Sequence, residues 1–210
     1  ASFLSIVLPF SFFLFFGKRK LSDTVLVEKN GVLNSVLLVF AGLAVSVLMN
    51  IPANLISQLL EGAGLNGDAN TADLLAMTPV QALMMFVSVV LVAPVTEEFA
   101  FRSVTTAVMR RWGDWPAVIF SALIFGMAHY SIQSLPVVLT AGFVMALLYV
   151  RTRNIWVNIF VHMLNNLLAT LPIALEGLVG ADAANIASNL LTYIVYGLGL
   201  IALVVLLIRN

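Results

Sequence analysis

The chain has 210 residues, of which 61% are hydrophobic and 10% are charged, and its formal net charge is zero. A soluble globular domain is about 45–50% apolar and about 25% charged. The larger apolar fraction of this chain, its small charged fraction and its mean hydropathy of +1.07 indicate that most of it lies in the bilayer. No basic tract suited to neutralising phosphates is present, which argues against nucleic acid as a partner, and the absence of cysteine excludes disulfides, thiolate metal sites and cysteine nucleophiles.

Seven apolar runs follow one another along the chain, and in lipid they must be helices, because no water satisfies the backbone there. They lie at about residues 2–16, 32–60, 80–109, 115–129, 135–150, 155–172 and 190–208. The first run is short for a full span, and we expect a helix truncated at its start rather than the core of a signal peptide. The sequence therefore predicts an all-α fold, a polytopic membrane helix bundle of about seven transmembrane helices.

No soluble domain, low-complexity linker or internal repeat separates these runs. We therefore expect residues 1–210 to form a single integral-membrane domain. The Glu, Arg and His residues within the apolar runs are confined to the third, fourth and sixth runs, which places a motif-bearing core at about residues 80–172.

Basic and non-basic loops alternate along the chain, and this pattern sets the orientation of a membrane protein. The basic positions are Lys18, Arg19, Lys20, Lys29, Arg110, Arg111, Arg151, Arg153 and Arg209. The intervening loops carry acids alone or no charge, and the acids are Glu61, Asp68, Asp73, Glu176 and Asp182. The rule that basic loops stay inside predicts a multi-pass protein with its N-terminus outside and its C-terminus in the cytoplasm.

Polar residues of three runs lie at a similar depth when ~1.5 Å per residue is counted from the basic loops. Glu97 is then ~20 Å deep, His129 ~21 Å, His162 ~14 Å and Asn166 ~20 Å. The chain has no other histidine. Because a charged side chain inside the bilayer costs several kcal/mol, such residues are usually functional, paired, or both.

The third run carries two adjacent glutamates with different expected roles. Glu98 and Arg102 have the spacing and order of a helical ion pair, whereas Glu97 projects about 100° away around the axis. We expect Arg102 to neutralise Glu98 and to leave Glu97 facing elsewhere. The alternative to a functional role is that these charged side chains only form a packing network between helices, and we favour this alternative for Glu98 and Arg102. Pro94 lies just upstream and can kink the helix, because it lacks a backbone donor.

The sixth run carries a polar stripe with helical spacing, formed by Asn158, His162, Asn165 and Asn166. Such a stripe usually faces the bundle interior, where interhelical hydrogen bonds satisfy it. Asn158 and Asn165 are expected to do no more than make such contacts.

A carboxylate and an imidazole around one buried water can deprotonate it for attack on a carbonyl. A second histidine, with an asparagine one helical turn away, can donate hydrogen bonds to the developing oxyanion. This set of side chains, one carboxylate, two histidines and an asparagine, fits amide hydrolysis by an activated water.

Zinc ligation is the rival reading, because Glu97, Glu98, His129 and His162 offer suitable donors. The sequence lacks the HExxH pattern of two histidines on one helix face, and one glutamate is expected to pair with Arg102. We therefore expect no metal and no other cofactor. If zinc is bound, its predicted ligands are Glu97, His129 and His162.

Three motifs resemble those of a known family. EEFAFR at residues 97–102 resembles an EExxxR motif, FGMAH at 125–129 an FxxxH motif, and HMLNN at 162–166 an HxxxN motif. Together, and in this order, they are similar to the CAAX-protease and bacteriocin-processing family of intramembrane endopeptidases, which includes the type II prenyl-protein endopeptidase. That endopeptidase has one more span than is predicted here, which a missing upstream span or a reduced architecture would explain.

The resemblance implies a role for each motif residue. Glu97 would be the general base and His129 would help to activate the water. His162 and Asn166 would form the oxyanion hole, and the positions of Glu98 and Arg102 would be structural.

We therefore predict an intramembrane endopeptidase that acts beside the lipid bilayer on a membrane-associated peptide or protein. A lipidated tail, a bacteriocin leader and a pheromone precursor all remain open as substrates, and so does a membrane-protein partner that delivers the substrate. The alternatives are a non-catalytic immunity or scaffold protein and an ion-coupled transporter, since transporter helices also carry Glu and His relays.

Overall fold

The computed structural model describes residues 2–18, 20–65, 78–129 and 131–209. The predicted loop charges at Arg19, Asp68 and Asp73 lie outside these residues. The described part is almost wholly helical, with one isolated bridge between Val27 and Asn154 and no strand in these ranges.

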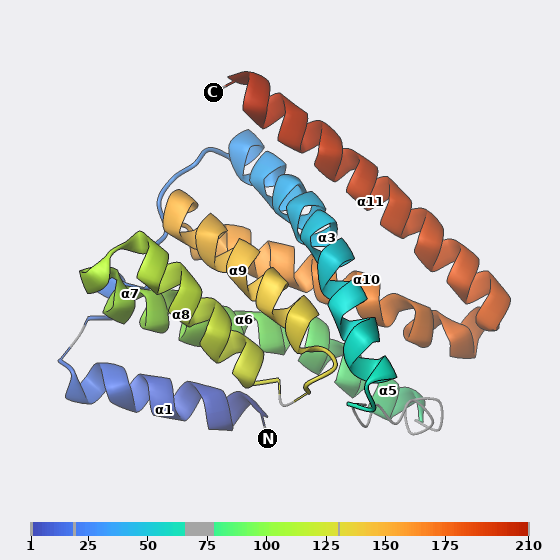
Figure 1. The fold of residues 1–210 in the computed structure, drawn as a ribbon, viewed down its shortest axis with the longest axis horizontal. Coiled ribbons are helices and arrows are strands. Elements are labelled where there is room, and N and C mark those ends of the chain that lie inside the picture. Colours follow the sequence, from blue (N-terminus) through green and yellow to red (C-terminus); the bar gives the residue numbers. More distant parts are fainter. Residues whose placement is uncertain (1, 19, 66–77, 130, 210) are drawn as a thin grey trace.

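The helices follow one another in a bundle (Figure 1). The α-helices are α1 (Ser2–Phe16), α2 (Leu21–Thr24), α3 (Val32–Gly62), α5 (Pro79–Phe86), α6 (Ala93–Glu97), α7 (Thr105–Met109), α8 (Asp114–Met127), α9 (Leu135–Thr152), α10 (Ile155–Val179) and α11 (Ala181–Arg209). Two π-helical turns, η1 (Val87–Val92) and η2 (Glu98–Val104), flank α6, and a 3-10 turn, η3 (Arg110–Trp112), follows α7.

Five helical segments within the described residues are long and apolar enough to cross a membrane. They are Val32–Gly62, Val80–Trp112, Leu135–Thr152, Ile155–Glu176 and Ala181–Arg209. Two shorter apolar helices, Ile6–Phe16 and Asp114–Met127, complete the set. These seven segments coincide with the seven predicted runs, so the predicted fold class is confirmed: the chain is an all-α, multi-pass membrane bundle.

Two helices extend further than the apolar runs that predicted them. α10 continues past Pro172 to Val179, and α11 begins at Ala181 rather than near residue 190. The turn between them is made at Gly180, whose φ of 83° suits a residue without a side chain. α10 and α11 therefore form an antiparallel hairpin (Figure 1).

Small residues allow the helices to approach one another closely, as is usual in membranes. α11 lies along α3 (Figure 1), and a Cβ placed on Gly199 would come within 2.5 Å of the Phe40 carbonyl oxygen. α9 meets α8 in the same way, because a Cβ on Gly142 would come within 2.9 Å of the Phe125 ring. The third membrane segment packs against α1, α8 and α10.

The third segment departs from a regular α-helix on both sides of Pro94. The π-helical turns η1 and η2 precede and follow α6, and Pro94 is buried in the first turn of α6. Thr105, the first residue of α7, donates from its backbone N–H to the Ala100 carbonyl oxygen, five residues earlier, and its hydroxyl donates to the same oxygen at 3.0 Å. The predicted disturbance at Pro94 is therefore present as widened turns, which are frequent at functional sites.

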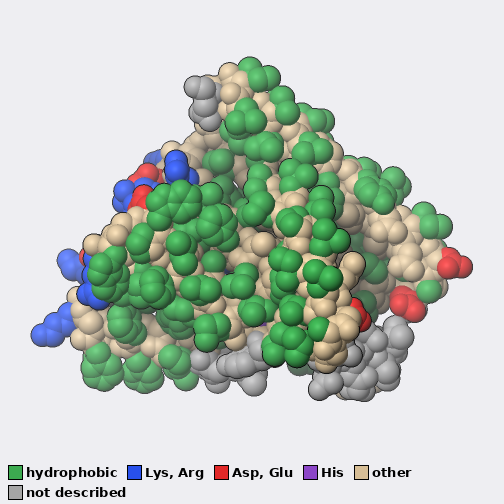
Figure 2. Space-filling view, in the orientation of Figure 1, with side chains coloured by type: hydrophobic (Ala, Val, Ile, Leu, Met, Phe, Trp, Pro, Cys, Tyr) green, Lys and Arg blue, Asp and Glu red, His purple; other side chains and the backbone are tan. Residues whose placement is uncertain are grey.

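Charged side chains are separated between the two ends of the bundle. Figure 2 shows Lys and Arg gathered at the left of the view, with some Asp and Glu among them, and Asp and Glu without basic neighbours at the right. Among the described acids, Glu61, Glu176 and Asp182 lie at or beside helix ends that carry no lysine or arginine. This separation agrees with the alternating loops read from the sequence.

Candidate active site

The four predicted catalytic residues line one cavity of about 510 Å³. Glu97 ends α6, His129 follows α8, and His162 and Asn166 lie one turn apart on α10. The remaining lining residues come from α1, η1 and α6: Ile6, Ser88, Val89, Val92, Ala93 and Thr96. Three separate membrane segments thus bring the predicted residues together. Asn165, the fourth member of the polar stripe, does not line this cavity.

Glu97 presents an unsatisfied carboxylate oxygen to the cavity. Its Oε2 is buried and has no hydrogen-bond partner among the described residues. The nearest basic atom is His162 Nε2 at 3.8 Å, which is beyond hydrogen-bonding distance. A buried acceptor without a partner is costly and calls for an explanation, and a water or substrate group in the cavity would supply one.

Glu98 is fully buried and points away from the cavity into a polar cluster. Its Oε2 lies 3.2 Å from Arg102 Nε, so the predicted ion pair is present. Asn158 Nδ2 donates to the same oxygen at 3.3 Å, and His162 Nδ1 donates to Oε1 at 2.9 Å. The two adjacent glutamates therefore have different surroundings, as their spacing predicted.

The Glu98–His162 hydrogen bond was not predicted from the sequence. It joins residues on two helices, and the only available signal was that both lie at a similar depth in the bilayer. Because Nδ1 of His162 donates to the carboxylate, the ring is oriented with Nε2 towards Glu97.

Asn158 also does more than the sequence predicted. Besides its contact with Glu98, its Nδ2 donates to the Met145 carbonyl oxygen at 2.6 Å and so links α10 to α9. The side chain is completely buried. The prediction that Asn158 makes interhelical contacts is correct, but one of these contacts is with the carboxylate that orients His162.

His129 has a defined ring orientation at the end of α8. Its Nδ1 lies 2.8 Å from the Phe125 carbonyl oxygen. A carbonyl can only accept, so Nδ1 carries the proton and Nε2 is left as an acceptor. The side chain is exposed on the cavity lining, so this acceptor is available to water.

Asn166 is held by η1. Its Nδ2 donates one hydrogen to the Val89 carbonyl oxygen at 2.9 Å. An asparagine amide has two such hydrogens, and no residue that the structure describes accepts the second, which can therefore serve a group in the cavity.

One aromatic ring contacts three of the motif residues. The Phe125 ring is 4.6 Å from the His129 ring and 5.8 Å from the His162 ring, measured between centroids. The Arg102 guanidinium lies over the face of Phe125 at 4.1 Å, a favourable cation–π arrangement. Phe125, the phenylalanine of the FxxxH motif, therefore packs against residues of all three motifs.

The donors do not form an evident metal centre. Among the described residues, no group of three or more Asp, Glu or His side chains is placed to hold a metal ion. Glu97 and His162 approach each other, and the Nδ1 hydrogen bonds of His162 and His129 leave only Nε2 of each ring for a further partner.

Comparison with known proteins supports the motif assignment. Residues 79–168 match a family model described as "Type II CAAX prenyl endopeptidase Rce1-like". A protein of Bacillus subtilis (strain 168) named "Putative membrane peptidase YdiL" is 31% identical over 140 residues, which are 66% of this chain and 57% of that protein. The match thus spans little more than half the length of that relative. No solved structure matches this chain significantly.

Proposed function

From the similarity of residues 79–168 to the CAAX-protease and bacteriocin-processing family, we propose that this chain is an intramembrane endopeptidase. It hydrolyses a peptide bond of a membrane-associated peptide or protein by means of an activated water. One observation carries the proposal: Glu97, whose buried Oε2 has no hydrogen-bond partner within the described part of the chain, shares a single cavity with both histidines and Asn166.

In the proposed reaction, a water in the cavity gives a proton to Glu97 and hydrogen-bonds to Nε2 of His129. Its oxygen attacks the carbonyl carbon of the scissile bond, and the carbonyl electrons move onto oxygen. The C–N bond then breaks, and Glu97 returns the proton to the leaving amine. Acid–base catalysis of this kind contributes about 10²–10⁴-fold.

His162 and Asn166 stabilise the oxyanion in this scheme. Asn166 uses its free amide hydrogen. His162 donates through Nε2 only when both ring nitrogens carry protons, because Nδ1–H is already bound to Glu98. Glu98 lies on one side of the ring, 2.9 Å from Nδ1, and Glu97 lies on the other, 3.8 Å from Nε2. Glu98 is thus a positioning residue.

The substrate class is proposed from the surroundings. The cavity lies within membrane helices, so the scissile bond must reach it from the bilayer or its surface. A lipidated tail or the precursor of a secreted peptide would satisfy this requirement, with or without a membrane partner that delivers it.

The decisive experiment compares Glu97→Gln with the matched control Glu61→Gln, which changes an exposed glutamate at the far end of α3. Membrane peptides of cells with each variant are compared by mass spectrometry with those of cells with the unchanged protein. We expect cleavage products to disappear only with Glu97→Gln, while the purified variant keeps its thermal unfolding temperature. Products that persist with Glu97→Gln would refute a role as base and would favour a transporter or scaffold.

We further propose that no metal takes part. Glu98 and Arg102 neutralise each other, which leaves about one negative charge and two imidazoles, whereas zinc sites usually order at least three ligands. Chelators should therefore leave the purified protein active, and elemental analysis should find less than stoichiometric zinc. Stoichiometric zinc, with activity lost on chelation and restored by the metal, would make Glu97, His129 and His162 ligands instead.

A further inference from the structure

A second concave site lies on the other side of α10. It is a groove of about 640 Å³ between the first halves of α3 and α10. On α10 it is lined by Trp156, Phe160 and Leu164, which form one stripe at a spacing of four residues. The catalytic stripe, with His162 and Asn166, is offset by two residues, or about 200° around the helix. The groove is therefore separate from the catalytic cavity.

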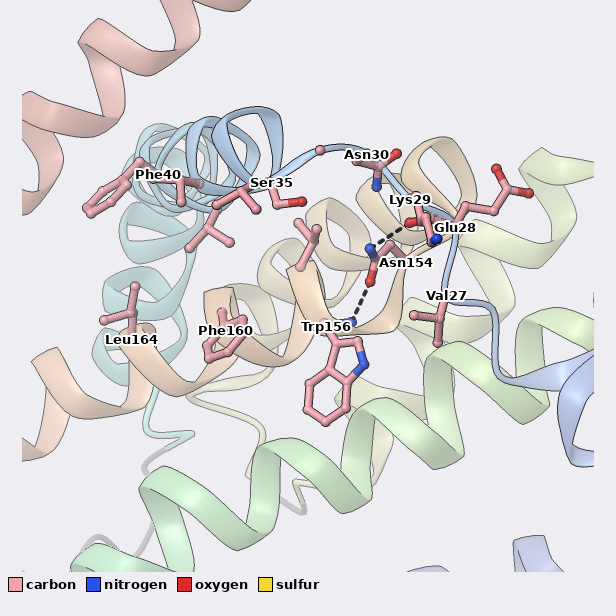
Figure 3. A pocket seen from close by; sticks show the side chains of 15 residues that line it. Val27, Glu28, Lys29, Asn30, Ser35, Phe40, Asn154, Trp156, Phe160 and Leu164 are labelled. Carbon is pink, nitrogen blue, oxygen red and sulfur yellow. Dashed lines mark hydrogen bonds between the residues drawn. The ribbon is translucent and has the colours of Figure 1, made fainter.

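The groove has a polar end and an apolar wall (Figure 3). The polar end is formed by the segment 28–31 and Asn154, and the wall continues along α3 through Val36 to Phe40. Eight residues separate Trp156 from Leu164, which corresponds to ~12 Å along the helix. The hydrocarbon core of a bilayer is about 30 Å thick, so the wall spans most of one leaflet.

The polar end is fixed in place. Asn154 Nδ2 donates to the Glu28 carbonyl oxygen at 2.8 Å, and its Oδ1 accepts from the Trp156 backbone N–H at 3.0 Å (Figure 3). The Glu28 backbone N–H also donates to the Arg153 carbonyl oxygen. The groove is thus a preformed feature of the loop between α2 and α3, docked on the turn before α10.

The charge at this end is positive. Glu28 is neutralised by Arg153, with 2.7 Å between the carboxylate and Nε. Lys29 is exposed on the rim and makes no ion pair among the described residues. Basic pockets between membrane helices attract anionic headgroups, and each lysine near the surface contributes about 1 kcal/mol.

We propose that the groove binds one anionic phospholipid from the surrounding bilayer. Its headgroup would lie against Lys29 and Asn30, and one acyl chain would lie along Val36, Phe160 and Leu164. The charge of the rim suits the headgroup, and the length of the wall suits one chain of one leaflet. This site is independent of the proposed protease activity.

Native mass spectrometry of the full chain in detergent tests the proposal. The protein is mixed with equal amounts of phosphatidylglycerol and phosphatidylcholine that have identical acyl chains. We expect one phosphatidylglycerol to be retained preferentially. Lys29→Gln should reduce that preference roughly fivefold, which corresponds to one lysine at the surface. Val36→Trp should obstruct the apolar wall where the acyl chain would lie and reduce retention of both lipids.

Two matched variants control for general effects of charge and bulk. Lys20→Gln removes an exposed lysine that does not line the groove, and Leu207→Trp adds an indole on the exposed face of α11. Both should bind lipid like the unchanged protein. Equal retention of the two lipids, or the same loss with Lys20→Gln as with Lys29→Gln, would overturn the proposal. The proposal would also be overturned if the unchanged protein were a dimer and Val36→Trp dissociated it, because a second copy of the chain would then occupy the groove.

Discussion

The carboxylate of Glu98 takes contacts from Arg102, Asn158 and His162, and none of its surface reaches solvent. A buried carboxylate is tolerated only when such partners replace its water. The same contacts that satisfy Glu98 also orient His162 towards the catalytic cavity. Stability and function are therefore linked at this residue.

Glu98→Gln should destabilise the protein, because it leaves Arg102 charged and buried without its partner. Breaking a buried pair from one side typically costs about 3–5 kcal/mol, which thermal unfolding in detergent would detect. The double variant Glu98→Gln with Arg102→Met removes both charges and should recover much of the loss. If Glu98→Gln is as stable as the unchanged protein, the pair is not the structural element described here.

For the contacts of Glu98, the sequence was informative only within one helix. The Glu98–Arg102 pair follows from a spacing of four residues, and this prediction is correct. The bond from His162 to Glu98 joins residues 64 positions apart. It depends on how α10 is rotated about its axis, which no local pattern specifies.

Among the elements, close approach of α11 and α3 depends on one glycine. Gly199→Ala should be destabilising by about 1–3 kcal/mol, because the new Cβ would overlap the Phe40 carbonyl oxygen and the Ala44 side chain. Gly197 lies two residues earlier, and a Cβ there meets nothing within 4 Å.

Gly197→Ala is therefore the matched control and should be neutral or slightly stabilising, since alanine is the better helix former. Thermal unfolding of the two variants, purified side by side, distinguishes a packing effect from a general effect of glycine. Equal unfolding temperatures would contradict close packing at Gly199.

Hydropathy predicted the existence of the helices better than their ends. The first turns of α11 contain Asp182, Asn185 and Ser188, which no apolar run includes, yet alanines around them favour a helix. Hydropathy reports which residues suit lipid, whereas helix propensity and the turn at Gly180 set the true ends. The π-helical turns of the third segment were not predicted, because Pro94 indicates a disturbance and not its form.

For the whole molecule, the separation of charge in Figure 2 bears on how the chain sits in the membrane. We propose that the basic end faces the cytoplasm, with the N-terminus outside and the C-terminus inside. The absence of cysteine makes this simple to test, because single cysteines can be added to the natural sequence.

In intact cells, an impermeant maleimide should label Glu61→Cys and Asp182→Cys and should leave Lys20→Cys and Arg209→Cys unlabelled. All four positions are exposed in the structure, so protection would reflect the membrane and not the fold. Labelling of all four after the cells are opened is the control. The reverse pattern in intact cells would invert the proposed orientation.

The contacts of Phe125 have a consequence for the dimensions of the site. One flat, stiff ring touches both imidazoles and the guanidinium of Arg102. Because the ring packs against both imidazoles, its size constrains where His129 and His162 lie relative to each other. A smaller side chain at residue 125 would remove one packing contact from each histidine and from Arg102 at the same time.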